Sequence, residues 1–361
     1  MAATIRAAAE LAVVAETTSH RTAFWQAILA GEFSAGKLAG FLSQLDPDDA
    51  TSVETLLRNP KLTDRERSQI RQSQTASTEG VTWLEEANFP EPLLGVSGLP
   101  PALTFRGDRA ALNLPAIAIV GTRSAGTYGK ACAQKFAEAF ARAGVTVVSG
   151  GALGIDAAAH RGALNVAGRS IAVLATGVDG VYPPLNAGLF KELLPSGGLL
   201  SQYAVGSTPD SYKFLQRNYL IAALSLAVLV VEAPAKSGAL RTAQHAAELG
   251  REVFVVPANL DNRNFYGSFQ LIRDGATLVT HPEQILESLG IGGLFTPANE
   301  PTSDSNSLAD KILRVLSVDA VAPEILVAQV DADPSDVLAE LTVLEIDGLI
   351  LRDGGKYAKK P

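Results

Sequence analysis

Short apolar runs alternate with amphipathic stretches over most of the chain after residue 105. Each run has the length of a strand and is apolar throughout, which is typical of strands buried on both faces of a parallel sheet. The stretches between them have helical periodicity, so the pattern predicts a doubly wound α/β domain. The predicted strands are Ile117–Val120, Val145–Ser149, Ser170–Ala175, Leu199–Gln202, Leu226–Glu232, Glu252–Val256 and Ala276–Val279. The predicted helices are Lys130–Ala143, Ile155–Val166, Ala187–Leu194, Phe214–Leu224, Ala239–Leu249 and Phe265–Arg273.

The regions on either side of this pattern differ from it. Residues 1–88 predict a helical N-terminal module, with helices over Ala2–Ala15, Ala23–Ala30, Ser34–Leu45 and Val53–Leu57. Four prolines within residues 89–105 mark an extended, turn-rich linker at the start of the α/β domain, which we place at residues 89–290. Residues 291–306 have the composition of a flexible linker. Residues 307–361 predict a winged-helix domain, with helices over Leu308–Leu316, Pro323–Val330 and Pro334–Asp347 and a hairpin over Leu349–Tyr357.

Composition narrows the class of protein. The 361 residues carry a net charge of −8, but residues 107–290 contain 15 Lys and Arg against 13 Asp and Glu, so the central domain alone is positive. Since screening confines electrostatic attraction to about 10 Å, the acidic average does not exclude a nucleic-acid partner. Cys132 is the single cysteine, which excludes an internal disulfide and a cysteine-based zinc site. We find no membrane span and no secretion signal, and expect a cytoplasmic protein without a metal or cofactor.

Turns that follow the predicted strands carry the candidate chemistry. Ligands of doubly wound sheets bind beyond the carboxyl ends of the strands, where the strand order reverses. The turns there are rich in Gly, Ser and Thr, and they place backbone N–H groups at helix N-termini, which suits a phosphate. Arg123 lies in the first of them and could grip a phosphate with two parallel hydrogen bonds. These turns are residues 121–123, 149–154, 176–179 and 233–238.

A second candidate segment runs from Tyr212 to Asn218. Its two cations and two aromatic rings fit a strip that stacks a base and holds neighbouring phosphates. Alternatives stay open: Phe214 as a core residue, Arg217 in a surface ion pair and Asn218 as a helix N-cap. Arg241 follows the turn at Ser237 and Gly238, and either faces a phosphate or is solvated.

Other nucleotide and catalytic motifs receive little support. Neither G-x-G-x-x-G nor G-x-x-x-x-G-K-[ST] is present, and the glycines could simply form tight turns. Asp156 and His160 are spaced to pair on one helix, and Glu232 precedes a helix that carries His245. No Ser/His/Asp spacing or metal-ligand cluster appears, so we assign no catalytic residue. An enzyme of the nucleotide phosphoribohydrolase type on the same fold remains the alternative, and a scaffold for protein partners is a third reading.

Several motifs together resemble the DNA-processing protein A family (DprA, also called Smf). They are Ile119–Arg123, Ser149–His160, Thr176–Asp179 with Tyr182 and Pro183, Phe214 with Arg217 and Asn218, Val230–Ala233, Ser237–Leu240 with Thr242 and Ala243, and Leu271 and Ile272 with Gly275 and Ala276. The resemblance covers about residues 89–281, with order and spacing kept. It implies an extended Rossmann-like domain that dimerises, binds single-stranded DNA, protects incoming DNA during natural transformation and loads the RecA recombinase, with no established catalytic activity.

The resemblance also implies which residues contact DNA. Arg123 would grip a phosphate in the first turn. Backbone and hydroxyl contacts would come from Gly121, Thr122, Ser149, Gly150, Ser237 and Gly238. The strip of cations and aromatics would comprise Lys213, Phe214, Arg217 and Asn218. Acidic residues dominate the presumed recognition helix of the tail, so we predict that it contacts protein and does not read duplex DNA in the major groove.

Overall fold

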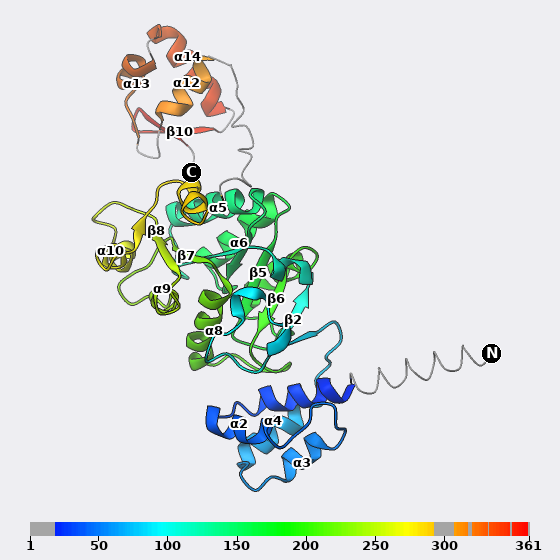
Figure 1. Ribbon diagram of the computed structural model, residues 1–361. Coiled ribbons are helices and arrows are strands. Elements are labelled where there is room, and N and C mark those ends of the chain that lie inside the picture. The colour runs from blue at the N-terminus through cyan, green and yellow to red at the C-terminus, as the bar shows by residue number, and fades with distance from the viewer. Residues whose placement is uncertain (1–18, 292–306, 317–319, 331, 347–348, 360–361) are drawn as a thin grey trace, which may run out of the picture. The chain divides into compact units, whose positions relative to one another are not determined.

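The computed structural model describes residues 19–291, 307–316, 320–330, 332–346 and 349–359 of the chain (Figure 1). The chain divides into two compact units, residues 1–294 and residues 295–361. The predicted helix Ala2–Ala15 lies outside the described residues, as does the 291–306 linker apart from its first residue.

A nine-stranded sheet forms the centre of the first unit and confirms the prediction of a doubly wound, mostly parallel fold. Neighbouring strands among β3 to β9 all pair in parallel. Strands β1 and β2 extend the sheet beyond β6 at one edge, where they pair in the antiparallel sense. In that order the strands are β1 (Thr82–Glu85), β2 (Ala102–Gly107), β6 (Gly198–Ser201), β5 (Ser170–Leu174), β4 (Thr146–Ser149), β3 (Ala116–Val120), β7 (Ala227–Val230), β8 (Glu252–Val255) and β9 (Thr277–Leu278).

Helices cover both faces of this sheet. The α5, α6, α7 and α11 helices pack on one another, and α8, α9 and α10 do the same as a separate layer. The five central strands, β3 to β7, are buried along their whole length, which explains why they appear in the sequence as mostly apolar runs. The helices are α5 (Thr127–Arg142), α6 (Ile155–Asn165), α7 (Ala187–Leu193), α8 (Ser211–Leu224), α9 (Ala239–Glu248), α10 (Tyr266–Arg273) and α11 (Pro282–Ser288).

Two strands were not predicted. Residues 102–105 were assigned to a linker because of the prolines nearby, but β2 begins immediately after Pro101 and its first four residues are buried. Pro100 and Pro101 therefore precede the ladder and cost it no hydrogen bond. An antiparallel strand also needs no crossover helix, so β1 and β2 lack the alternation with helices that revealed the others.

The strand order reverses between β3 and β7. From β3 the chain steps outward through β4, β5 and β6, and α8 then returns it to β7 on the opposite side of β3. The carboxyl ends of β3 and β7 are therefore neighbours, with Val120 paired to Val230. This reversal opens a crevice between the turns that follow the two strands.

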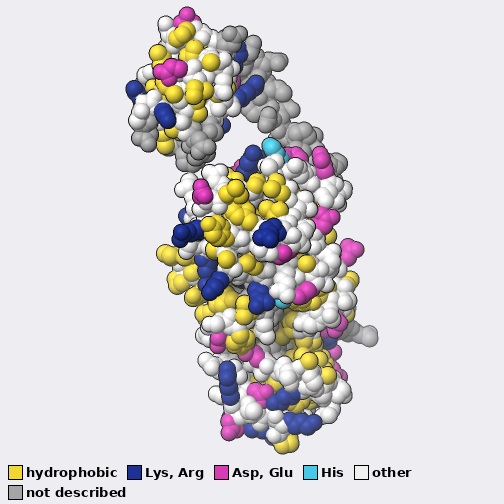
Figure 2. Space-filling view, turned by 90° about the vertical axis from the view of Figure 1, so that its left-hand side faces the viewer, with side chains coloured by type: hydrophobic (Ala, Val, Ile, Leu, Met, Phe, Trp, Pro, Cys, Tyr) yellow, Lys and Arg dark blue, Asp and Glu magenta, His cyan; other side chains and the backbone are white. Residues whose placement is uncertain are grey.

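The surface of the sheet domain mixes charge with exposed apolar side chains. Figure 2 shows lysine and arginine side chains set among hydrophobic patches on the face that carries α9 and α10. The exposed apolar residues of this domain include Leu215, Tyr266 and Leu278. Nucleic-acid interfaces use both kinds of group, the cations for phosphates and the flat apolar surfaces for bases.

The predicted helical N-terminal module is present, and it belongs to the same compact unit as the sheet. It consists of a helix over residues 19–30, then α2 (Ala35–Leu42), α3 (Ser52–Arg58) and α4 (Asp64–Ser73), around a core that includes Phe24, Phe41 and Ile70. The side chain of Gln26 joins it to the sheet domain: its Nε2 donates to the carbonyl of Val205 at 2.9 Å, and its Oε1 accepts from the Val205 N–H. The α4 helix had not been predicted.

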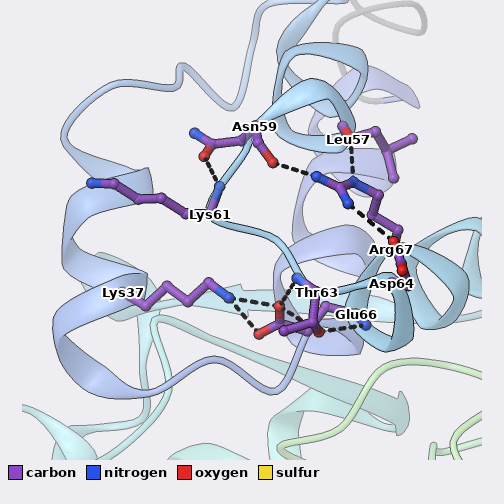
Figure 3. Close-up of polar contacts among 8 residues, drawn as sticks. All are labelled: Lys37, Leu57, Asn59, Lys61, Thr63, Asp64, Glu66 and Arg67. Atoms are coloured by element: carbon purple, nitrogen blue, oxygen red, sulfur yellow. Dashed lines mark hydrogen bonds and ion pairs between the residues drawn. The ribbon is translucent and has the colours of Figure 1, made fainter.

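The start of α4 explains why the module holds together. Thr63 caps the helix by accepting from the Glu66 N–H, and Glu66 accepts from the Thr63 N–H in return (Figure 3). The same Glu66 carboxylate pairs with Lys37 of α2 at 2.6 Å. Arg67 donates to the carbonyls of Leu57 and Asn59. The first turn of α4 therefore connects α4 to both α2 and α3.

The second unit confirms the winged-helix prediction. Its described residues form α12 (Leu308–Val315), α13 (Pro323–Val330), α14 (Pro334–Ile346) and a hairpin of β10 (Ile350–Asp353) and β11 (Lys356–Lys359). Gly354 and Gly355, both with positive φ, make the turn of the hairpin. Among all the described helices, none is both long and apolar enough to cross a membrane.

Candidate nucleic-acid interface

A cleft of about 310 Å³ lies at the point where the strand order reverses. The turn after β3 and the turn after β7 form two of its walls, and the first three turns of α8 and the first turn of α9 form the others. Eight of the predicted contact residues line it: Gly121, Thr122, Arg123, Phe214, Arg217, Asn218, Ser237 and Gly238. Lys236 and Thr242, which were not predicted as contacts, line it as well.

Arg123 stands exposed at the rim of this cleft. Its guanidinium lies 4.9 Å from the centre of the Phe214 ring. The ring is half-buried and also touches Tyr182, with ring centres 5.5 Å apart. Arg123 forms no ion pair with any described residue, so its charge is open to a ligand. The pair offers a cation and a flat ring side by side, the combination that a phosphate and a base require.

Residues that line the cleft keep unpaired backbone N–H groups. Within the described residues, the N–H groups of Arg123, Lys236 and Gly238 make no hydrogen bond. Gly238 immediately precedes α9, where the helix dipole adds a partial positive charge. The Ser237 hydroxyl accepts from the Ala239 N–H at 3.2 Å, which fixes the turn and leaves its own proton free to donate. This wall of the cleft therefore presents donors to an anion.

Arg217 lies at the floor of the cleft. It is only 5% exposed, and its Nη1 donates to the carbonyls of Gly150 and Val173 at the ends of two strands. Burial lowers the pKa of this guanidinium to about 10, so it keeps its charge at neutral pH. The buried Asp156 carboxyl accepts from the N–H groups of Gly150 and Ala152; burial raises its pKa, and the charge of Arg217 acts in the opposite direction. Arg217 is therefore a buried structural cation beneath the cleft and not the surface ion pair considered as an alternative.

The first turn of α5 is already occupied by the chain itself. The Glu232 carboxylate, 1% exposed, accepts from the Gly126 N–H at 3.1 Å and from Asn264 Nδ2 at 2.8 Å. A Cβ on Gly129 would lie 2.0 Å from a Glu232 oxygen, so only glycine admits the carboxylate here. Among the described residues, the free donors of the cleft therefore include the N–H and guanidinium of Arg123 and the N–H groups on the α9 side, and Glu232 holds the Arg123 turn in place.

Four predicted contact residues are turned to other partners. The Ser149 hydroxyl donates to the Ile119 carbonyl at 2.6 Å, and the backbone of Gly150 is bonded to Asp156 and Arg217. Lys213 is buried and points to the N-terminal module, where its Nζ lies 2.7 Å from a Glu32 oxygen. Arg241 is exposed, donates to Gln244 and does not line the cleft. A role of these four in DNA binding stays a prediction.

The two possible acid–base pairs, Asp156 with His160 and Glu232 with His245, are not formed. His160 bonds through Nδ1 to the Ser170 hydroxyl at 2.7 Å, and burial lowers its pKa to about 3, so the ring is neutral. His245 pairs with Glu248 on its own helix. Asp156 and Glu232 are each held by backbone N–H groups, as described above. No pair is left poised for proton transfer in the cleft.

Sequence reasoning missed Lys236 and Tyr182 as members of the site. Lys236 lies in the turn between Ala233 and Gly238 that had been singled out, directly before Ser237, and its position in a glycine-containing turn was the available signal. Tyr182 belongs to a quoted motif, but its contact with Phe214 joins a loop to helix α8, which lies elsewhere in the sequence. No local pattern reveals such a pairing.

The comparisons with known proteins agree with this architecture. Residues 80–290 match the family model "DNA recombination-mediator protein A", and residues 296–356 match the "DprA winged helix domain". Protein Smf of Synechocystis is 37% identical over 76% of this chain and 79% of its own length, and Protein Smf of Escherichia coli is 39% identical over 77% and 79%.

Solved structures give the same result. The X-ray structure of DNA processing protein A from Streptococcus pneumoniae superposes with a TM-score of 0.59 at 28% identity and covers 77% of this chain and 96% of that one. DNA processing protein A from Helicobacter pylori, whose single-stranded DNA binding mode has been described, gives 0.53 at 31% identity and covers 58% and 95%. The chain belongs to the DNA recombination-mediator protein A family of DNA-processing proteins, also known as DprA or Smf.

Proposed function

We propose that this protein binds single-stranded DNA in the cleft between the β3 and β7 turns. The observation that carries the proposal is the exposed, unpaired Arg123 guanidinium stacked on Phe214 beside free N–H groups at the start of α9. The phosphates of the strand contact Arg123, Lys236 and these N–H groups, and a base stacks at Phe214. The positive balance of residues 107–290 supports this assignment.

The family membership extends the proposal to a cellular role. Acting in the cytoplasm as a homodimer, the protein protects incoming single strands during natural transformation and loads the RecA recombinase onto them. The acidic α14 helix of the winged-helix domain supports a role of that domain in protein contacts, since Asp336, Glu340 and Glu345 would repel the phosphates of a duplex.

A gel-shift comparison of single-stranded and double-stranded oligonucleotides at two salt concentrations tests DNA binding. We expect a preference for the single strand, and we expect its affinity to fall as salt rises because phosphate contacts release counterions. Equal affinity for both forms, or no shift of either, would contradict the proposal.

We further propose that the cleft binds without catalysis. The nucleotide phosphoribohydrolase alternative requires an accessible carboxylate, whereas Glu232 is buried and its oxygens are bonded to Gly126 and Asn264. Incubation with nucleoside monophosphates should therefore release no free base. Base release that disappears in Glu232→Gln would establish the enzyme instead.

Replacing Phe214 by alanine should remove the stacking platform. We expect the affinity for a single strand to fall by about 5- to 100-fold, which is the usual effect of one lost stacking contact. The half-buried position of the ring predicts that the fold survives, as circular dichroism would show. Leu215→Ala is the matched control, because this exposed neighbour lines the cleft but has no π-face. An equal loss in both variants would contradict stacking.

A further inference from the structure

A second hollow, of about 670 Å³, lies between the N-terminal module and the sheet domain. Helix α8 separates it from the cleft: Leu215 lines the cleft, whereas Tyr212 and Gln216 line the hollow. The α4 helix contributes Arg65 and Gln69 to its walls. Its volume falls within the range of about 300–1,000 Å³ that is usual for small-molecule and cofactor sites.

One wall of the hollow combines a flat ring with an open cation. The Tyr212 side chain is 37% exposed, and its hydroxyl is bonded to the Glu32 carboxylate, which fixes the orientation of the ring. Arg65 is exposed and forms no ion pair within the described part of the chain. A stacking surface and an unpaired guanidinium are again what a base and a phosphate require.

Glutamine side chains supply hydrogen-bonding edges. Gln202 Nε2 donates to the Tyr203 hydroxyl at 3.2 Å, and that hydroxyl lies 3.0 Å from Gln216 Oε1. The carbonyl oxygen of Gln202, the amide nitrogen of Gln216 and the whole amide of Gln69 have no partner among the described residues. Such amides can donate to and accept from the edge of a base.

The acidic groups of the hollow are neutralised by cations of the chain. Glu32 pairs with Lys213 at 2.7 Å, and Glu66 pairs with Lys37 at 2.6 Å. The charge left unbalanced on the wall is that of Arg65. The N-terminal module is acidic as a whole, but this part of its surface attracts a phosphate.

We propose that the hollow binds a nucleotide of the same single strand that occupies the cleft, with Tyr212 stacking on a base and Arg65 contacting a phosphate. The inference rests on the proposed DNA binding. An α-helix with side chains is about 10–12 Å across, and successive phosphates of one DNA strand are about 3.4 Å apart along a duplex. A single strand outside a duplex advances further per nucleotide, so at most about three or four nucleotides passing the exposed Leu215 would connect the two sites.

The test measures the affinity of the full chain for oligothymidylates of increasing length. For strands long enough to reach both sites, we expect Tyr212→Ala to weaken binding about 5- to 100-fold. Tyr212→Phe keeps the ring but loses the bond to Glu32 that orients it, so we expect a much smaller loss than in Tyr212→Ala. Arg65→Ala should weaken the same strands and make their salt dependence shallower, whereas Arg71→Ala on the same helix should do neither. Strands that fill the cleft alone should bind all variants equally.

The possible outcomes separate the two proposals. If the wild type binds no single strand, the proposed function fails and the inference fails with it. If the wild type binds but Tyr212→Ala and Arg65→Ala retain its affinity at every length, the inference alone is overturned. Thymidine monophosphate serves as the free-nucleotide probe: if these variants lose its binding but not the length dependence, the hollow is a mononucleotide site and the proposal of a shared strand is wrong.

Discussion

Arg123→Ala is expected to weaken single-stranded DNA binding by about 30- to 140-fold, equivalent to about 2–3 kcal/mol. The guanidinium is exposed, unpaired with any described residue, and stacked on Phe214, so its loss removes a charged hydrogen-bonding group and one side of the stacking platform. The slope of log affinity against log salt should become shallower by about one unit. Fluorescence anisotropy with a labelled oligothymidylate measures both quantities.

Two further variants show which property of Arg123 matters. Arg123→Lys keeps the charge but not the planar fork, and we expect it to restore only part of the affinity. Arg241→Ala removes an arginine that lies outside the cleft and donates to Gln244, so its effect should be smaller than that of Arg123→Ala. Wild-type affinity in Arg123→Ala, or an equal loss in Arg241→Ala, would show that the site has been placed wrongly.

Gly154→Ala should lower the free energy of unfolding of the first unit by about 3 kcal/mol or more. Gly154 has φ +79° and ψ −123°, a conformation that L-residues rarely adopt. A Cβ there would also lie 2.3 Å from the Thr122 carbonyl oxygen and 2.6 Å from that of Arg123. These atoms are backbone, so relief of the clash has to displace the turn that carries Arg123.

Gly250→Ala separates the cost of the positive φ from the cost of the steric clash. Gly250 has a similar φ of +70°, but a Cβ there would have no neighbour within 4 Å. We expect it to cost only about 1 kcal/mol. Urea unfolding followed by tryptophan fluorescence is suited to the comparison, because both tryptophans of the chain, Trp25 and Trp83, lie in the first unit. Equal stability losses in the two variants would contradict the steric argument.

The parallel core could be predicted from sequence because each of its strands and helices has a pattern of apolar residues that is visible within its own segment. Strand β3 is apolar at every position and β5 at every position but Ser170, and helices follow both, so period and length were enough. Strand β2 was not predicted, because it pairs with β6, about ninety residues away, and no crossover helix connects it to a parallel neighbour. Prolines beside it then favoured a linker, although they end where the strand begins.

The candidate site likewise has a part that could be predicted from sequence and a part that depends on distant partners. That Gly121, Arg123, Ser237 and Gly238 meet at one crevice follows from the general rule for doubly wound sheets. The directions of individual side chains on α8 do not follow from any such rule. Lys213 and Phe214 are adjacent in sequence but face different partners, because the N-terminal module supplies Glu32 to one of them and Arg123 approaches the other. Only the packing of the module against α8 decides this.

Glu232 has a consequence for the turn that carries Arg123. In dinucleotide-binding domains of this architecture, the pyrophosphate of the cofactor occupies the N-terminus of the helix after the first strand. Here a tethered side chain fills the position permanently. The turn that presents Arg123 is therefore completed by the chain's own carboxylate and needs no bound dinucleotide to hold it.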